Sequence, residues 1–325
     1  MDAILVTGGA GFIGSHLVDT LLARGERVVA IDDFNDYYSP KIKHKNIESA
    51  LKNPHFHLEQ GDIRDFPFLE RVFKRYPIKC VVHLAARAGV RPSVEDPILY
   101  EEVNGVGTTN LLELSRRYKV PKFVYGSSSS VYGYSDQVPF RESVCADRPV
   151  SPYAATKRAN ELMCHAFHHL FGIKIVCLRF FTVYGPRQRP EMAIHKFTRL
   201  IDQGKEIPVY GDGSSKRDYT YIDDIIQGVV AAIDKDFDFE IFNLGESQVT
   251  DLLTLIKLIE ENLGKPAKIK FLPFQAGDVP ITYADISKAR ELLGYNPQVP
   301  IEEGIKRFIS WYKEEARDLY TGGDK

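Results

Sequence analysis

Short apolar runs alternate with longer amphipathic stretches through the first half of the chain. Strands are predicted at Ala3–Thr7, Arg27–Ile31, His55–Glu59, Cys80–Leu84, Lys122–Ser127 and Ile173–Arg179. Helices are predicted between them, at Phe12–Arg24, Pro40–Leu51, Asp65–Tyr76, Pro97–Tyr118 and Pro152–Phe171. Near-continuous apolar strands that alternate with helices form βαβ units, whose parallel sheet is covered on both faces. The pattern therefore predicts a doubly wound α/β fold.

The regular alternation ends at Phe180, and the chain beyond it is richer in turn-forming residues. Further helices are predicted at Glu191–Gln203, Ile222–Ile233, Asp251–Asn262, Ile286–Leu293 and Ile301–Glu315, and a strand is predicted at Glu240–Leu244. This strand returns the chain to the sheet. We therefore expect a sheet domain of residues 1–179 and 222–249, and a smaller C-terminal lobe of residues 180–221 and 250–325.

The composition argues against several kinds of partner. The 325-residue chain has a net charge of −2, which gives no electrostatic reason to expect a nucleic acid or an anionic membrane. No apolar run approaches the about 20 residues of a membrane-spanning helix, and no signal-peptide pattern precedes the first strand. The four cysteines are scattered and form no C-x-x-C pair. We therefore expect a cytoplasmic protein.

A glycine-rich turn joins the first predicted strand to the first predicted helix. Gly8, Gly11 and Gly14 have the spacing G-x-x-G-x-x-G, and Phe12 and Ile13 open the helix. Glycine permits a tight turn, a close approach of the backbone to a pyrophosphate, and contact between helix and sheet. The N-terminus of a helix offers free N–H groups and a positive potential to phosphates. These five residues are therefore predicted to bind a dinucleotide.

Acidic and small residues follow the next strands at positions suited to the same ligand. Asp32 ends the second strand, eighteen residues after the last glycine of the turn. A carboxylate there accepts hydrogen bonds from both adenosine ribose hydroxyls and repels a 2′-phosphate, so NAD is favoured over NADP. Asp62 and Ile63 follow the third strand, where Asp62 is placed to reach the adenine edge. Ala85 and Ala86, after the fourth strand, leave room for the cofactor beside the backbone.

A phenol and an ammonium group lie four residues apart on a predicted helix, at Tyr153 and Lys157, so both face the same side. A tyrosine with a free pKa of about 10 is a poor base at neutral pH. A neighbouring lysine cation and the positive nicotinamide ring of NAD both lower that pKa. The phenolate then takes a proton from a hydroxyl group as hydride leaves the same carbon. Tyr153 and Lys157 are therefore predicted to be catalytic and to contact NAD.

A run of serines follows the fifth strand, at the carboxyl edge of the sheet where ligands bind. A serine at this edge can hydrogen-bond the reacting oxygen and relay its proton. Ser127, Ser128 and Ser129 are the candidates for this contact with the substrate. The residues alone leave the choice among them open.

The glycine turn, the serine run, Tyr153 with Lys157, and the C-terminal lobe resemble the extended short-chain dehydrogenase/reductase superfamily over nearly the whole chain. In that superfamily the catalytic serine or threonine lies three residues before Val-Tyr-Gly, which implies Ser128 here. The asparagine that lies beside the nicotinamide pocket in the superfamily matches Asn104. The resemblance implies a Rossmann domain that binds NAD and a lobe that binds a nucleotide sugar.

Two positions of the serine run separate the reactions of this superfamily. The 4,6-dehydratases carry Asp-Glu directly before Val-Tyr-Gly, and the UDP-glucuronate decarboxylases keep a glutamate there. This chain has Ser129 and Ser130 instead, with no carboxyl group for either reaction. The resemblance therefore implies reversible oxidation at C4 of the sugar, which is the reaction of a nucleotide-sugar 4-epimerase with permanently bound NAD.

The segment after the sixth strand indicates the sugar. Thr182 and the run from Gly185 to Met192, which contains Arg189, are similar to the UDP-glucuronate 4-epimerases. The UDP-galactose 4-epimerases generally have asparagine at position 182. A guanidinium and a hydroxyl group suit a C6 carboxylate, so Arg189 and Thr182 are predicted to hold it and to prevent loss of CO2 from the 4-keto sugar. The resemblance implies conversion of UDP-glucuronate to UDP-galacturonate.

Further matches to the same epimerases lie at Asp36–Tyr38, Ala88–Arg91 and Gln275–Pro280. The resemblance implies that Gln275, where galactose epimerases usually have arginine, and Asp278 contact the substrate. Arg217 matches the arginine that grips the UDP pyrophosphate, and a surface ion pair with Asp218 is its alternative. Arg91 is expected either to face the pocket or to form a salt bridge within its loop.

Other functions remain open beside this one. Epimerisation of a neutral sugar, UDP-glucose or UDP-N-acetylglucosamine, is the nearest alternative, and a non-catalytic NAD-binding scaffold is a remote one. The resemblance also implies a homodimer formed through the helices Pro97–Tyr118 and Pro152–Phe171. Three histidines of the second helix have helical spacing, but no carboxylate or cysteine is placed to complete a metal site, so we expect no metal.

Overall fold

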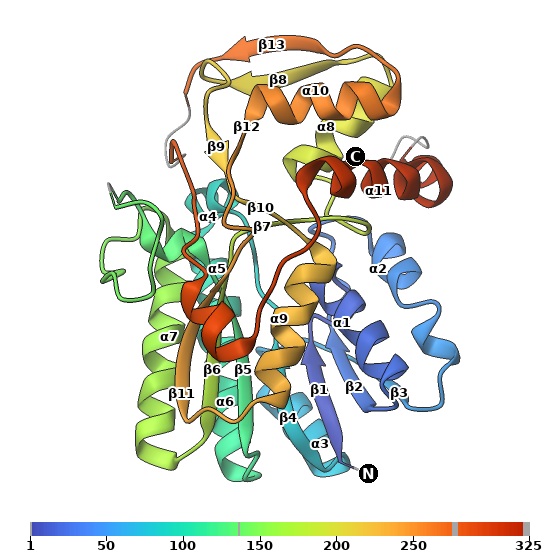
Figure 1. Cartoon of the computed structure of the whole chain (residues 1–325). Coiled ribbons are helices and arrows are strands. Elements are labelled where there is room, and N and C mark those ends of the chain that lie inside the picture. Colours follow the sequence, from blue (N-terminus) through green and yellow to red (C-terminus); the bar gives the residue numbers. More distant parts are fainter. Residues whose placement is uncertain (1, 136, 275–278, 321–325) are drawn as a thin grey trace.

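A computed structural model describes residues 2–135, 137–274 and 279–320, and a single seven-stranded sheet lies at its centre (Figure 1). Its strands are β1 (Ala3–Thr7), β2 (Arg27–Asp32), β3 (Phe56–Gln60), β4 (Ile78–His83), β5 (Lys122–Ser128), β6 (Lys174–Phe180) and β11 (Phe239–Leu244). The order across the sheet is β3-β2-β1-β4-β5-β6-β11, and all neighbouring pairs are parallel. The direction of winding reverses between β1 and β4, where ligands bind in such folds. The expected doubly wound α/β fold is confirmed.

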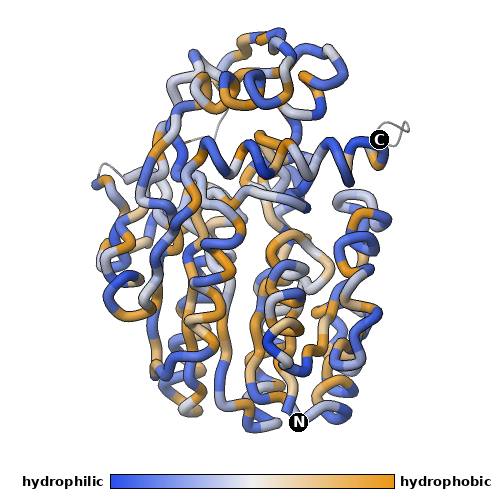
Figure 2. Tube along the Cα trace, turned by 45° about the vertical axis from the view of Figure 1, so that its right-hand side comes forward, coloured by the Kyte–Doolittle hydropathy of each residue, from blue (hydrophilic) through white to orange (hydrophobic). Residues whose placement is uncertain are grey.

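Side chains alternate between the two faces of the sheet, and each face is covered by its own helices. Along β1, Ile4 and Val6 belong to one hydrophobic cluster and Leu5 to the other. The first cluster includes residues of α1 (Phe12–Ala23) and α9 (Ile222–Asp234), and the second includes residues of α3 (Phe66–Arg75), α6 (Gly107–Arg117) and α7 (Pro152–Phe171). The sheet strands are coloured mainly as hydrophobic in Figure 2. Burial of both faces explains why these strands are near-continuous apolar runs.

The long helix expected at Pro97–Tyr118 is interrupted. It consists of α5 (Pro97–Tyr100), a π-helical segment η2 (Glu101–Val106) and α6. Asn104 is buried within the π-helical segment, where its Oδ1 accepts a hydrogen bond from the Arg87 N–H (2.8 Å) and its Nδ2 donates to Thr156 Oγ1 (3.1 Å). A π turn inserts an extra residue into a helix and often marks a functional site. Hydrophobic periodicity gives no sign of it.

Elements from the second half of the chain lie above the carboxyl edge of the sheet (Figure 1). Three strand pairs form there: β7 (Thr182–Tyr184) with β10 (Tyr219–Tyr221), β8 (Glu206–Tyr210) with β13 (Lys268–Leu272), and β9 (Lys216–Arg217) with β12 (Thr250–Asp251). The remaining helical elements of the chain are α2 (Pro40–Asn46), η1 (Ala50–Lys52), α4 (Val90–Glu95), η3 (Ser129–Tyr132), α8 (Ala193–Asp202), α10 (Leu252–Leu263), η4 (Ala289–Leu293), α11 (Ile301–Trp311), η5 (Tyr312–Ala316) and η6 (Arg317–Tyr320). The strand pairs were not predicted, because such short strands lie within turn-rich sequence.

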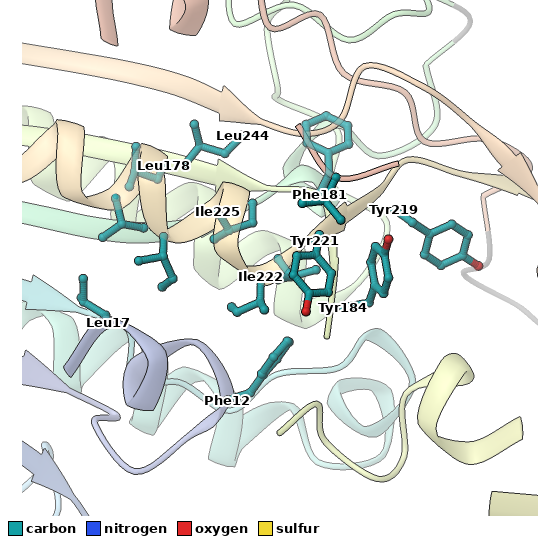
Figure 3. Packing of buried hydrophobic residues seen from close by; sticks show 14 of the residues in the cluster. Phe12, Leu17, Leu178, Phe181, Tyr184, Tyr219, Tyr221, Ile222, Ile225 and Leu244 are labelled. Atoms are coloured by element: carbon teal, nitrogen blue, oxygen red, sulfur yellow. The ribbon is translucent and has the colours of Figure 1, made fainter. Parts of the chain in front are cut away.

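Tyrosines join these upper elements to the first face of the sheet. The ring of Tyr184 is perpendicular to those of Tyr219 and Tyr221, with centroid distances of 6.3 and 5.6 Å (Figure 3). Phe181 and Ile222 belong to the same cluster, which also extends into β8 and α10. The wall above the carboxyl edge is therefore continuous with the main hydrophobic core, and this continuity fixes the position of the residues that face the edge.

Candidate active site

A cleft of about 390 Å³ lies over the carboxyl ends of the central strands. Its volume is within the range of pockets that hold cofactors and small ligands. The lining includes most of the residues singled out from the sequence: Gly8, Gly11, Phe12, Ile13, Gly14, Asp32, Asp62, Ile63, Ala85, Ala86, Ser127, Ser128, Ser129, Tyr153, Lys157, Thr182 and Arg189. Residues from seven separate segments of the chain thus meet in one cavity.

The glycine turn is packed backbone against backbone. A Cβ atom at Gly14 would lie 2.0 Å from the carbonyl oxygen of Gly8, so no side chain fits there. The helix α1 begins at Phe12, directly after the turn, and has no acidic residue in its first turn. Its N-terminal N–H groups and the positive end of its dipole therefore face the cleft without a competing anion, as phosphate binding requires.

Asp32 is buried at the end of β2, and its carboxylate is held by three groups. The N–H groups of Phe34 and Ala10 donate to its two oxygens (3.0 and 3.1 Å), and Lys43 Nζ lies 3.4 Å from Oδ1. Burial raises the pKa of Asp32, and the Lys43 charge opposes this effect. Lys43 was not predicted as a site residue. A lysine on the helix after Asp32 was the available signal, but helix periodicity alone does not show that it is buried.

Tyr153 lies in the first turn of α7. Ser151 caps this helix through its Oγ, which accepts a hydrogen bond from the Ala154 N–H (3.2 Å), and Pro152 occupies the first helical position. These two residues set where the helix begins and therefore where the phenol points. Burial raises the pKa of Tyr153, whereas a hydrogen bond with Ser128 and the positive charge of Arg189 lower it.

Lys157 lies one helical turn after Tyr153 and is anchored to β5. Its Nζ donates to the Gly126 carbonyl (2.6 Å) and lies 4.9 Å from the centroid of the Tyr125 ring. Burial lowers the pKa of Lys157 to about 8. The positive charge beside the phenol of Tyr153 that lowers its pKa is that of Arg189, while the Lys157 ammonium donates to the end of β5; the predicted effect of Lys157 on the phenol stays a prediction.

The serines after β5 make different contacts. Ser128 has an extended backbone at the end of β5, and its Oγ accepts a hydrogen bond from the Ser130 N–H (3.1 Å) while contacting the phenol of Tyr153. Ser127 lines the cleft, but its hydroxyl donates to Glu161 Oε1 (2.6 Å). Ser128 is therefore the serine that adjoins Tyr153, and a substrate contact by Ser127 stays a prediction.

Glu161 is a further residue that the sequence analysis missed. It is buried beneath the cleft, where Arg179 donates two hydrogen bonds to its carboxylate (2.9 and 2.8 Å). The spacing Tyr153, Lys157, Glu161 places all three on one face of α7, and this was the signal available in the sequence. The hydrogen bonds of Glu161 to Ser127 and Arg179 join α7 to the ends of β5 and β6. Glu161 thereby holds the helix that carries the catalytic candidates.

Thr182 and Arg189 line the end of the cleft formed by the second half of the chain. Thr182 opens β7, and its N–H donates to the carbonyl of Asp218 (3.1 Å). Arg189 lies in the loop between β7 and α8, with its Nε 3.1 Å from Glu191 Oε1. Both residues line the same cavity as Tyr153, and hydroxyl and guanidinium groups can each donate hydrogen bonds to a carboxylate.

Three other predicted site residues, Asn104, Arg91 and Arg217, are not among the described residues that line the cleft, and their predicted ligand contacts stay predictions. Asn104 does not line it, because its amide is used to hold the Arg87 backbone and α7. The guanidinium of Arg91 lies 4.6 Å from the ring centroid of Tyr210, because α4 turns it toward β8. Arg217 Nη1 donates to the carbonyl of its neighbour Lys216 (2.9 Å) along the short strand β9.

Asp218 is fully buried and accepts hydrogen bonds from the backbone N–H groups of Glu246, Ser247 and Ala284, so it offers no surface ion pair to Arg217. A contact of Arg217 with the UDP pyrophosphate stays a prediction. Gln275 and Asp278 lie outside the described residues.

In the part of the chain that the structure describes, no helix has the length and apolar character to cross a membrane. Nor does that part contain a group of three or more His, Cys, Asp or Glu side chains arranged to hold a metal ion.

Comparisons with known proteins agree with this geometry. Residues 5–308 match the sequence profile of the family described as GDP-mannose 4,6 dehydratase. The chain is 44% identical over 315 residues to a UDP-glucuronate 4-epimerase from Thermodesulfobacterium geofontis, with 97% of each chain covered.

Two solved structures are similar over almost the whole chain. One is a UDP-glucuronic acid 4-epimerase from Bacillus cereus in complex with UDP-glucuronic acid and NAD, with a TM-score of 0.91, 40% identity, and coverage of 98% of this chain and 100% of the other. The second is a UDP-glucose 4-epimerase from Thermotoga maritima with UDP-glucose, with a TM-score of 0.89, 35% identity, and coverage of 96% and 99%.

The buried pair of Glu161 and Arg179 leads to a stability prediction. Glu161→Gln leaves the Arg179 guanidinium buried without its counter-charge, so the free energy of unfolding is expected to fall by about 3–5 kcal/mol. Urea denaturation followed by circular dichroism measures it. The matched control is Glu113→Gln, which removes a surface carboxylate paired with Arg116 and is expected to change stability by less than about 1 kcal/mol. Equal effects of the two substitutions would contradict the proposed importance of the buried pair.

Proposed function

We propose that this chain, which belongs to the extended short-chain dehydrogenase/reductase superfamily and within it to the family described as GDP-mannose 4,6 dehydratase, is an NAD-dependent UDP-glucuronate 4-epimerase. The observation that carries the proposal is the composition of the cleft. Ser128, Tyr153 and Lys157 meet beside the glycine turn, and Thr182 and Arg189 line the same cavity.

The described residues fit NAD. The turn around Gly8 and Gly14 admits no side chain and opens on the N-terminus of α1, so a pyrophosphate can approach the backbone closely. Asp32 lies at the end of β2, where a carboxylate binds the adenosine ribose hydroxyls and disfavours a 2′-phosphate. Bound NAD would accept hydride from C4 of the sugar and return it to the opposite face of that carbon.

The side chains supply the proton transfer. Tyr153, as a phenolate, takes the proton of the C4 hydroxyl during oxidation and gives it back during reduction. Ser128 hydrogen-bonds the phenol and holds the reacting oxygen in line with it. Lys157, fixed to the carbonyl of Gly126, keeps the geometry at the base of the cleft constant through both steps.

The distribution of acids favours epimerisation over dehydration. The described acidic residues that line the cleft are Asp32, Asp33 and Asp62, and all follow β2 or β3. Tyr153 lies near the end of β5, on the other side of β1 and β4. Ser128, which contacts the phenol, is followed by Ser129 and Ser130, and serine side chains cannot act as the acid and base of an elimination. Of the two reactions, these side chains therefore favour reversible oxidation at C4 of the sugar, which is the chemistry of epimerisation.

The sugar end of the cleft favours an acid over a neutral substrate. Arg189 offers a planar donor to a C6 carboxylate and Thr182 offers a hydroxyl. Two-point binding would hold the carboxylate out of line with the C4 carbonyl, which opposes decarboxylation of the β-keto acid. Epimerisation of UDP-glucose is the second candidate, because a UDP-glucose 4-epimerase shares the fold and its dimensions.

We extend the proposal to the organisation of the chain. Residues 1–179 and 222–249 form the part that binds NAD, and residues 180–221 and 250–325 form the part that covers the UDP-sugar. The position of the β8–β13 pair, α8 and α10 above the carboxyl edge supports this division (Figure 1). A cytoplasmic location fits the free thiols of Cys80, Cys164 and Cys177, which are buried and form no disulfide.

A homodimer formed through α7 and its neighbour η2 is the final part of the proposal. Leu162 and Met163 on α7 have exposed fractions of 57% and 38%, and Ile98 and Val106 on the adjoining helical segments have 71% and 48%. Apolar side chains at this density on neighbouring helices are typical of a buried interface, and the same patch on a second copy would cover them.

The choice of substrate leads to a prediction for Arg189. Proton NMR follows the purified protein, without added NAD, in parallel reactions with UDP-glucuronate and with UDP-glucose. The protein is expected to convert UDP-glucuronate. Arg189 also lowers the pKa of Tyr153, so each variant is measured at a pH above the pKa of its base. Under these conditions, kcat/KM for UDP-glucuronate should fall by about 10- to 100-fold in Arg189→Gln because a charge-assisted contact is lost, and kcat/KM for UDP-glucose should fall far less. The control is Arg187→Gln, which removes a nearby guanidinium paired with Asp19. Equal losses for both sugars, or conversion of UDP-glucose alone, would refute the choice.

The proposed interface leads to a second prediction. Leu162→Glu places a charge in the centre of the apolar surface and is expected to yield a monomer, as measured by light scattering after size-exclusion chromatography. Phe271→Glu is the matched control, because Phe271 is 57% exposed but lies on β13 at the opposite end of the molecule. The control should remain dimeric. A dimeric Leu162→Glu protein, or a monomeric wild type, would exclude this interface.

A further inference from the structure

Two sequence motifs have no role in the function proposed so far, and the structure brings them together. Asp36–Tyr38 lies in the loop between β2 and α2, and Ala88–Arg91 lies at the start of α4. The Tyr37 hydroxyl donates to the carbonyl of Ala88 (2.9 Å). Tyr37 and Ala88 both line the cleft. The contact therefore joins two loops that border the same cavity.

The carbonyl of Ala88 accepts a second hydrogen bond from a tyrosine. Tyr100, the last residue of α5, donates to it through its hydroxyl (2.8 Å), and a carbonyl oxygen has two lone pairs for two such donors. The ring of Tyr100 is perpendicular to the ring of Tyr153, with centroids 6.3 Å apart. Tyr37 is thus linked, through Ala88 and Tyr100, to the ring of the proposed base.

Gly89 provides the space for this contact. Its φ of +109° is rarely adopted by residues with a side chain, and a Cβ atom there would lie 3.0 Å from the Tyr37 hydroxyl oxygen. The glycine after Ala88 is therefore needed for the Tyr37 hydroxyl to reach the Ala88 carbonyl. The hydrogen bond from Tyr37 to Ala88 therefore explains both the tyrosine in Asp36–Tyr38 and the glycine in Ala88–Arg91.

The ring of Tyr37 lies beside two guanidinium groups. The guanidinium carbons of Arg189 and Arg87 are 5.9 and 5.5 Å from the ring centroid, within the distance at which a cation is attracted to an aromatic face. Arg189 is further held by Glu191, whose Oε1 is 3.1 Å from its Nε. A long and flexible side chain is thereby given a fixed aromatic surface on one side and a counter-charge on the other.

We propose that Tyr37 is a positioning residue that holds Arg189 in the orientation needed to restrain the C6 carboxylate of the substrate. The inference rests on the proposed function. Once C4 is a ketone, breakage of the C5–C6 bond would release CO2 and leave the electron pair on C5 as an enolate conjugated with the C4 oxygen. That enolate would then take up a proton at C5. The step requires the C5–C6 bond to align with the carbonyl π system, and a fixed Arg189 prevents this alignment.

The experiment compares Tyr37→Leu, which removes the ring and the hydroxyl, with Tyr37→Phe, which keeps the ring. UDP-glucuronate labelled at C6 gives two products to measure, labelled CO2 and labelled UDP-galacturonate. In Tyr37→Leu the ratio of CO2 to epimer should rise by about tenfold and KM for UDP-glucuronate should rise by a similar factor, as expected for loss of a cation–π contact. KM for UDP-glucose should not change.

Tyr37→Phe separates the two parts of the side chain. Because the ring beside Arg189 is retained, the ratio of CO2 to epimer should stay much closer to that of the wild type than in Tyr37→Leu. The matched control is Tyr76→Phe, which removes a phenol hydroxyl bonded to Glu59 Oε1 (2.7 Å) outside the cleft and should leave the ratio unchanged. If Tyr37→Leu does not retain NAD or its fold, Gly89→Ala replaces it. The added Cβ atom would lie 3.0 Å from the Tyr37 hydroxyl oxygen and push the whole side chain, ring included, away from Arg189, so the ratio should again rise.

A wild-type ratio in folded Tyr37→Leu, or in Gly89→Ala when that variant is used, would overturn the inference. An equal rise in KM for both sugars would also overturn it, because that result describes a general loss of structure. Failure of the wild-type protein to convert UDP-glucuronate would instead refute the proposed function, and the role of Tyr37 would fall with it.

Discussion

The phenol of Tyr153, which we propose loses and regains a proton, is buried in this site, and the arrangement around it depends on that burial. Burial raises the pKa of Tyr153 because surroundings of low polarity disfavour the phenolate. The hydrogen bond with Ser128 and the positive charge of Arg189 act in the opposite direction. Lys157, also buried, is fixed to the Gly126 carbonyl, which leaves its ammonium as an anchor. Ser128 and Arg189 thus lower the pKa of the phenol, and Lys157 ties the helix that carries the phenol to β5.

The fold brings these groups together at one edge of the sheet. A doubly wound sheet collects the carboxyl ends of its strands at one edge, so the loops after β1, β2, β4 and β5 form a continuous wall. The helix α7 starts where Ser151 caps it, and the buried carboxylate of Glu161 ties its third turn to β5 and β6. Arg189 then adjoins Tyr153 from the opposite wall, so the group proposed to bind the substrate carboxylate also acts on the base.

Much of the sheet and of the cleft could be predicted from the sequence, because both depend on local signals. Continuous apolar runs identify buried parallel strands, and Gly14 or Asp32 follow such runs at fixed offsets. The remainder depends on contacts between distant segments. The π turn at Asn104, the burial of Lys43, and the direction of Arg91 are set by packing against other elements, which periodicity does not report. The short strands β7 to β10 exist only as pairs across the upper elements, so their sequences read as turns.

The central claim is that Tyr153 is the base and that Ser128 helps to set its pKa. The pH dependence of kcat for UDP-glucuronate tests it in the wild type and in Ser128→Ala. A base is active when deprotonated, so kcat should rise as the pH passes through the pKa of Tyr153. Loss of the Ser128 hydrogen bond raises that pKa, so the rising limb should move to higher pH in Ser128→Ala. A limb at the same pH in both proteins would contradict the account.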